Sequence, residues 1–192
     1  MDRFEYAIGL MSIIVGLGLA DLAMSLHRLL KHRMQVKWDG LAVGTAIYAA
    51  FTLVRMWYQL WTVRDLTEVT SLFFYLGLIL EMFLVFLAAA ATLPDESDPV
   101  HERWDLRAYY DRHRRYIWGL FVLFQLSYLG HALYFTQAFA GQGIPFAALL
   151  RFVLAPLAIY VALVSVRSRR LQAALLGLVF ALEAFNSWND AL

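Results

Sequence analysis

Residues 71–93, SLFFYLGLILEMFLVFLAAAATL, have Glu81 as their only charged residue. At about 1.5 Å per residue, a helix of this length crosses a hydrocarbon layer about 30 Å thick. Five other stretches are comparably long and apolar. The sequence therefore predicts an all-α integral membrane protein with six transmembrane helices in one domain, at residues 6–27, 41–62, 71–93, 117–139, 145–165 and 171–188.

The composition supports this fold class. Of the 192 residues, 61% are hydrophobic and 16% are charged, whereas a soluble domain is about 45–50% apolar. The charged residues cluster in short segments between the apolar stretches, which excludes a soluble globular fold. The absence of cysteine excludes a disulfide scaffold and cysteine-ligated metal sites. A net charge of +1 gives no reason to expect nucleic acid as a partner.

Lysine and arginine are distributed very unevenly between the two sides. Only Arg3 and Arg64 lie on the side of the termini, and Arg55 and Arg151 lie inside predicted spans. Because basic loops stay in the cytoplasm, we expect both termini outside, in the inner (plasma) membrane of a bacterial cell. The other basic residues lie in the first, third and fifth loops: Arg28, Lys31, Arg33, Lys37, Arg103, Arg107, Arg112, Arg114, Arg115, Arg167, Arg169 and Arg170.

The third loop, residues 94–116, combines arginines with aromatic residues. Trp104, Tyr109, Tyr110 and Tyr116 interleave with five arginines after an acidic cluster. This pattern predicts a helix lying at the cytoplasmic interface, with the arginines facing the phosphates of anionic lipids. The sequence also leaves open that the chain forms a homo-oligomer.

Five ionisable residues fall between the midplane and the outer third of the predicted spans. Each buried charge costs about 2.5–3.5 kcal/mol on insertion scales, so each needs a partner or a reason. The arginines and glutamates sum to zero charge, as a mutually paired set should. Spans two and three are joined by a short loop, so we expect Arg55 to pair with Glu81. The five are Arg55, Glu81, His131, Arg151 and Glu183.

Span two carries a polar stripe with helical spacing of three and four residues. Such a stripe would be costly against lipid, so it must face other helices or water. Two interpretations stay open: a cavity lining, to which Tyr128 of span four would contribute, or a buried stripe bonded to neighbouring helices. The stripe consists of Thr45, Tyr48, Thr52, Arg55, Gln59 and Thr62.

Two further residues in the spans carry expectations. Pro156 should kink span five and free a backbone carbonyl one turn earlier, near Phe152. Asp21 lies nearer the cytoplasmic end of span one. It is a candidate proton or cation site, although it could also meet water or Arg28.

Three functions fit these residues. The favoured hypothesis is a small-solute or ion transporter or channel, because of the stripe in span two. The first alternative is a structural or sensory subunit whose charges stabilise the bundle. The second is a membrane enzyme acting on a lipid or quinone, with Glu81 or Glu183 as base. The predicted transport site consists of Arg55, Gln59, Glu81, His131, Arg151 and Glu183, with Asp21 on the cytoplasmic route.

No cofactor or metal is expected. His131 is the only histidine well inside a span, and a haem with two histidine ligands from this chain would need a second. Both lysines lie in the first loop, so a retinal Schiff base inside the membrane is excluded. The phosphate-loop, H-E-x-x-H and G-x-S-x-G motifs are absent, which favours a protein that is not an enzyme.

Overall fold

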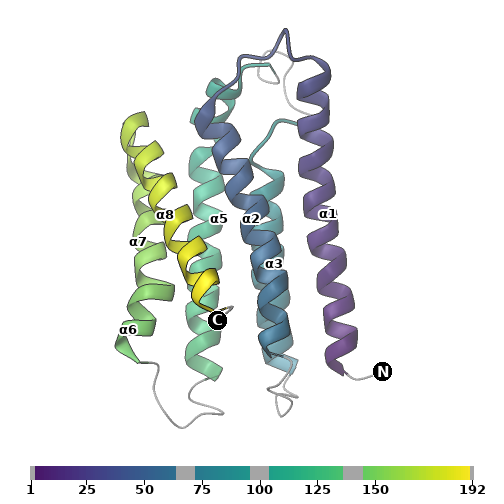
Figure 1. The fold of residues 1–192 in the computed structure, drawn as a ribbon, viewed down its shortest axis with the longest axis vertical. Helices are drawn as coiled ribbons and strands as arrows, with labels where there is room; N and C mark the ends of the chain where they lie inside the picture. Colours follow the sequence, from purple (N-terminus) through teal and green to yellow (C-terminus); the bar gives the residue numbers. More distant parts are fainter. Residues whose placement is uncertain (1–2, 64–71, 96–103, 136–144, 191–192) are drawn as a thin grey trace.

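The computed structural model describes residues 3–63, 72–95, 104–135 and 145–190. These residues form six helices and no strand, so the all-helical prediction is confirmed. The helices run alternately up and down in one bundle (Figure 1). They are α1 (Arg3–Lys31), α2 (Gly40–Val63), α3 (Leu72–Ala90), α5 (Leu106–Phe135), a composite helix of α6 (Phe146–Leu149), η2 (Leu150–Leu154) and α7 (Ala155–Ser165), and α8 (Arg169–Asp190).

The apolar character of these helices is that of a membrane protein. In α3 the apolar stretch Phe74–Ala90 is shorter than in the other apolar helices. Large apolar side chains such as Ile13, Val54 and Leu123 are exposed on the bundle surface, where lipid would contact them. Four stretches are long and apolar enough to cross a membrane: Ile8–Lys31, Gly40–Gln59, Leu106–Tyr134 and Phe146–Ser165.

An aromatic cluster forms the core where α2, α5 and α7 meet. Tyr48, Trp118, Phe121 and Tyr160 are fully buried and in mutual ring contact. The hydroxyls of Tyr48 and Tyr160 are 2.5 Å apart and share a hydrogen bond. Trp118 Nε1 donates to Tyr110 Oη at 3.1 Å. Buried hydroxyl and indole groups are costly without partners. The bond between Tyr48 and Tyr160 links α2 to α7, and the bond between Trp118 and Tyr110 satisfies the indole within α5.

The described parts of the first, third and fifth connections lie at the same end of the bundle, opposite the N-terminus (Figure 1). Ion pairs join these connections: Lys37 Nζ lies 3.1 Å from Asp105 Oδ2, and Arg169 pairs with both Asp39 and Asp111. The described basic residues of these three connections therefore gather at one end, which we call the basic end.

The expected interfacial helix in the third loop is wrong for residues 106–116. These residues are the first turns of α5, which continues without a break to Phe135. The reason is that their polar groups bond inside the bundle. The buried Tyr109 donates its hydroxyl to the carbonyls of Ala91 and Leu93, and the buried Arg114 donates to the carbonyl of Val166. Residues 96–103 lie outside the described part of the chain.

The free carbonyl expected one turn before Pro156 is confirmed. Proline has no amide hydrogen to donate to the carbonyl four residues earlier, which belongs to Phe152. That carbonyl instead accepts a hydrogen bond of 2.9 Å from Gln125 Nε2 on α5. The helix widens into the π-helical turn η2 immediately before the proline. The irregular backbone is therefore satisfied by a neighbouring helix, as a membrane interior requires.

We expect Asp105 to make stability at the basic end dependent on pH. A hydrogen bond from the Ala108 amide and the nearby Lys37 ammonium lower the pKa of Asp105. This stabilisation is complete above the unfolded value of about 4 and is lost as pH falls through the lower folded pKa. Asp105→Asn keeps a capping side chain but loses the charge, whereas Asp105→Ala also loses the cap, which costs about 1 kcal/mol.

Thermal unfolding of the three proteins between pH 3 and pH 7 measures this dependence. The wild type should lose its advantage over Asp105→Asn below about pH 4. The Asp105→Ala protein should be less stable than Asp105→Asn at every pH. Wild-type and Asp105→Asn curves that run parallel through the whole range would contradict the assignment.

Candidate functional site

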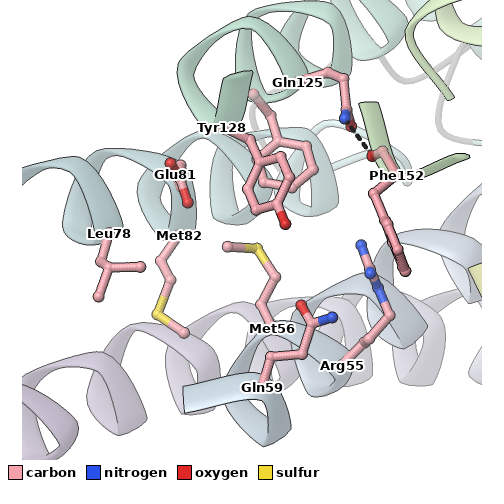
Figure 2. A pocket seen from close by; sticks show the side chains of 10 residues that line it. Arg55, Met56, Gln59, Leu78, Glu81, Met82, Gln125, Tyr128 and Phe152 are labelled. Carbon is pink, nitrogen blue, oxygen red and sulfur yellow. Dashed lines mark hydrogen bonds between the residues drawn. The ribbon is translucent and has the colours of Figure 1, made fainter. Parts of the chain in front are cut away.

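A cavity of about 60 Å³ lies inside the bundle, where α2, α3, α5 and η2 meet. Figure 2 shows Arg55 and Gln59 pointing from α2 across the cavity towards the hydroxyl of Tyr128 on α5. Glu81 reaches the cavity from α3. The remainder of the wall is mostly apolar. The lining residues are Arg55, Met56, Gln59, Leu78, Glu81, Met82, Phe124, Gln125, Tyr128 and Phe152.

Arg55 pairs with Glu183 of α8, so the expected pairing with Glu81 is wrong. Arg55 Nη1 lies 2.9 Å from Glu183 Oε2, and the two side chains are 11% and 3% exposed. The short connection between α2 and α3 makes these helices neighbours, which is why Glu81 was expected as the partner. The face of α2 that carries Arg55, however, also meets α8. A carboxylate at contact distance outweighs one across a cavity, because Coulomb attraction falls with distance and with any water in between.

Glu81 instead pairs with His131. His131 Nδ1 lies 3.0 Å from Glu81 Oε1, and the Glu81 side chain is 1% exposed. The imidazole also packs against the edge of the Phe74 ring at a centroid distance of 4.8 Å. Gly77 leaves room for it, since a Cβ there would be 3.2 Å from His131 Cγ. Phe74, Gly77 and Glu81 thus share one face of α3 and hold the imidazole together.

Arg151 is bound by an amide and by aromatic rings. Its Nε donates to Asn186 Oδ1 at 2.6 Å, and its guanidinium lies about 5 Å from the ring centres of Phe152 and Phe185. Within the described residues, Arg151 has no carboxylate partner. Since Glu183 and Asn186 are one turn apart on α8, Arg55 and Arg151 both bind the same half of that helix.

The polar stripe of α2 divides into two parts. Thr45, Tyr48 and Thr52 are fully buried and do not line the cavity. The Thr45 and Thr52 hydroxyls donate to the carbonyls one turn earlier, and Tyr48 bonds to Tyr160. Arg55 and Gln59 continue the stripe along the cavity wall. The side chain of Thr62 lies outside the described part of the structure.

Asp21 lies apart from this site. It is half-buried on α1, close enough to Arg28 and Asp95 for their charges to act on it. Arg28 itself pairs with Asp95 at 3.1 Å and donates to Ser25 Oγ at 2.8 Å. The structure therefore brings Arg55, Gln59, Glu81, Tyr128, His131 and Glu183 together, and it leaves Asp21 out.

The charges in the site balance, and a proton can move between Glu81 and His131 without a change in net charge. Arg55 and Glu183 cancel, and Glu81 and His131 share one proton whether they are ionised or neutral. Two buried nitrogens, Arg55 Nε and His131 Nε2, have no hydrogen-bond partner among the described residues. Of the two residues, Arg55 lines the cavity, where water is the natural partner for a buried polar group, since a cavity of this size holds about two molecules.

Sequence reasoning missed three residues that shape this site. Pro156 leaves the carbonyl of Phe152 without its helical donor, so a polar side chain on a neighbouring helix must donate to it, and Gln125 is that donor. Asn186 is found by looking one helical turn beyond Glu183 for a second polar side chain. Gly77, one turn before Glu81, indicates a close approach to the backbone because glycine is unfavourable in a helix interior.

The comparisons with known proteins add no assignment: no family model, curated protein or solved structure matches the chain. Among the described residues, no three histidine or acidic side chains are grouped to hold a metal ion.

Proposed function

We propose that this chain is a small membrane transporter or channel that moves a proton or a small inorganic ion through the cavity between α2, α3 and α5. The observation that carries this proposal is the wall of the cavity, where Arg55, Gln59, Glu81 and Tyr128 converge inside an apolar bundle. Charged side chains at this depth are expensive and most often mark an ion or proton pathway.

The size of the cavity supports a small cargo. A volume of about 60 Å³ accommodates roughly two waters, which is too little for a sugar, an amino acid or a quinone ring. The volume therefore gives no support to an enzyme acting on a lipid or quinone. Within the proposal, the cargo is small enough to exchange with water at Glu81 and Tyr128.

The proposed role of each residue follows from its contacts. Glu81 and His131 exchange the proton, because they form the pair at the cavity in which both partners can change protonation. Arg55 stays charged, since guanidinium does not deprotonate in proteins, and it is held at the cavity wall by Glu183. Asp21 is proposed to lie on the route towards the basic end.

The proposed orientation places the basic end in the cytoplasm and both termini outside, with all six helices crossing the inner membrane. The gathering of the basic connections at one end supports it. In that orientation α8 also crosses the membrane, although it is not among the four long apolar helices. Its polar residues Glu183 and Asn186 bind Arg55 and Arg151 of the neighbouring helices.

Proton flux into proteoliposomes tests the proposal. Vesicles containing a pH-sensitive dye are given a potassium diffusion potential, and acidification is followed for wild type, Glu81→Gln and Asp21→Asn. Glu81→Gln keeps the shape of the side chain but cannot ionise, so its flux should fall to the level of protein-free vesicles. Asp105→Asn is the matched control, because it removes a carboxylate at the basic end, away from the cavity.

Replacement of the potassium potential by gradients of sodium, chloride and other small ions extends the same assay. Ion flux in wild type that Glu81→Gln abolishes would support an ion channel in place of a proton carrier. Wild-type vesicles that show no flux of protons or of any small ion would contradict the proposal.

A second candidate function is a structural or sensory subunit, which the internal pairing of the charges favours. Arg55 with Glu183 and Glu81 with His131 need no cargo to be satisfied. In this case the Glu81→Gln protein would differ from wild type in thermal stability alone. This second function would be favoured if the vesicles show no flux and a protein partner is recovered in stoichiometric amount through the third loop.

A further inference from the structure

A second hollow lies on the outside of the bundle, in a groove between α2 and α8 with a volume of about 620 Å³. The walls of the groove are mostly apolar. Leu41, Gly44 and Ile47 line it from α2, and Leu176 and Phe180 line it from α8. At its end nearest the basic end it is bordered by Asp39, Arg169 and Arg170. The groove is therefore amphipathic along its length.

The groove is about as long as one leaflet is thick. On α8 it extends from Arg169 to Phe180, which is about 16 Å at 1.5 Å per residue. Half of a bilayer's hydrocarbon core is about 15 Å. An acyl chain lying in the groove would thus reach the middle of the membrane with its headgroup beside the arginines.

The two arginines at this end of the groove differ in their ion pairs. Arg169 is engaged by Asp39 and Asp111. Arg170 is exposed and makes no ion pair or hydrogen bond within the described chain. It lies in the first turn of α8, where the helix dipole also favours an anion. Arg170 is thus the cation available to a phosphate at this depth.

Gly177 leaves the backbone of α8 bare on the wall of the groove. It lies in the interior of α8, where glycine costs about 1 kcal/mol relative to alanine. A Cβ at this position would meet nothing within 4 Å, so packing inside the chain does not require a glycine. A backbone left bare on a groove wall fits a ligand that approaches it closely.

We propose that this groove binds one anionic phospholipid, with its phosphate at Arg170 and an acyl chain against Gly177 between α2 and α8. The site is distinct from the third loop and does not depend on ion transport. A second copy of the chain fits less well. In a symmetric dimer the same ends of two grooves would meet, which brings the arginines of both copies together.

Native mass spectrometry of the detergent-purified protein tests the proposal, with phosphatidylglycerol and phosphatidylcholine titrated separately. Gly177→Leu adds a bulky side chain at a point of the groove wall where a Cβ meets nothing within 4 Å, so it should weaken the first binding step of both lipids by about tenfold. Arg170→Gln should weaken phosphatidylglycerol alone by about fivefold, the effect of one basic residue near an anionic lipid. Arg33→Gln, an exposed basic residue at the same end but outside the groove, is the matched control.

Circular dichroism verifies that the variants fold, and Gly177→Ala replaces Gly177→Leu if the latter does not, with a smaller loss in the same direction. Equal first binding of phosphatidylglycerol to wild type, Arg170→Gln and the Gly177 variant would overturn the proposal. So would a wild-type dimer that the Gly177 variant converts to a monomer, because the occupant would then be a second copy of the chain.

Discussion

Replacement of Glu183 by glutamine is expected to lower the free energy of unfolding by about 3–5 kcal/mol, because it leaves the Arg55 guanidinium buried without a counter-charge. Arg55 is 11% exposed, and its Nε already has no partner in the described chain. A guanidinium cannot escape the penalty by losing a proton. The effect is therefore large for a single substitution that preserves side-chain shape.

The double variant Arg55→Met with Glu183→Leu should recover much of this loss, since paired apolar groups need no mutual charge. A double-mutant cycle measured by unfolding in mixed detergent micelles should give a coupling of roughly 2 kcal/mol or more for Arg55 and Glu183. The control cycle uses Arg55 with Glu81, which should couple by less than about 0.5 kcal/mol. Equal coupling in the two cycles would show that Arg55 is shared between both carboxylates.

The same reasoning makes the Glu81 pair cheaper to disrupt. When His131 is replaced, the Glu81 carboxyl can become neutral by taking up a proton, an option that Arg55 does not have. His131→Gln should accordingly be milder than Glu183→Gln. The contrast separates the two ion pairs by chemistry: Arg55 and Glu183 join α2 to α8 through a charge that cannot be lost, whereas Glu81 and His131 join α3 to α5 through groups that can both be neutral.

The positions of the helices follow from the sequence because a long apolar stretch has few alternatives in a membrane. The free carbonyl of Phe152 also follows from the sequence, because Pro156 has no amide hydrogen to donate to it. In contrast, the partner of Arg55 depends on how α8 crosses α2. That arrangement results from the packing of the whole bundle and leaves no local pattern in the sequence.

The two interpretations of the stripe on α2 could not be separated for a similar reason. Thr52 and Arg55 lie on the same face of the helix, yet Thr52 is fully buried and Arg55 borders a cavity. What differs is the volume of the side chains on the neighbouring helices: aromatic rings fill the space beside Tyr48 and leave some free beside Gln59. Polarity predicts which face is buried but not where packing is incomplete.

Gly77→Val should be destabilising, because it acts on the position of the His131 ring. A Cβ at Gly77 would already lie 3.2 Å from His131 Cγ and 3.3 Å from Nδ1, and valine adds two methyl groups. The imidazole has little freedom to retreat, since Phe74 flanks it and its Nδ1 is bonded to Glu81. Overpacking of this kind costs about 1–3 kcal/mol.

Gly130→Val on α5 is the control for Gly77→Val, because Gly130 is exposed and a Cβ there meets nothing within 4 Å. It should be close to neutral in unfolding measurements and in flux, whereas Gly77→Val should lose both stability and proton flux. Adding His131→Ala to Gly77→Val removes the ring that is struck, so it should restore stability but not flux. Equal stability of the two valine variants would mean that the imidazole can move aside, and that Gly77 does not hold it against Glu81.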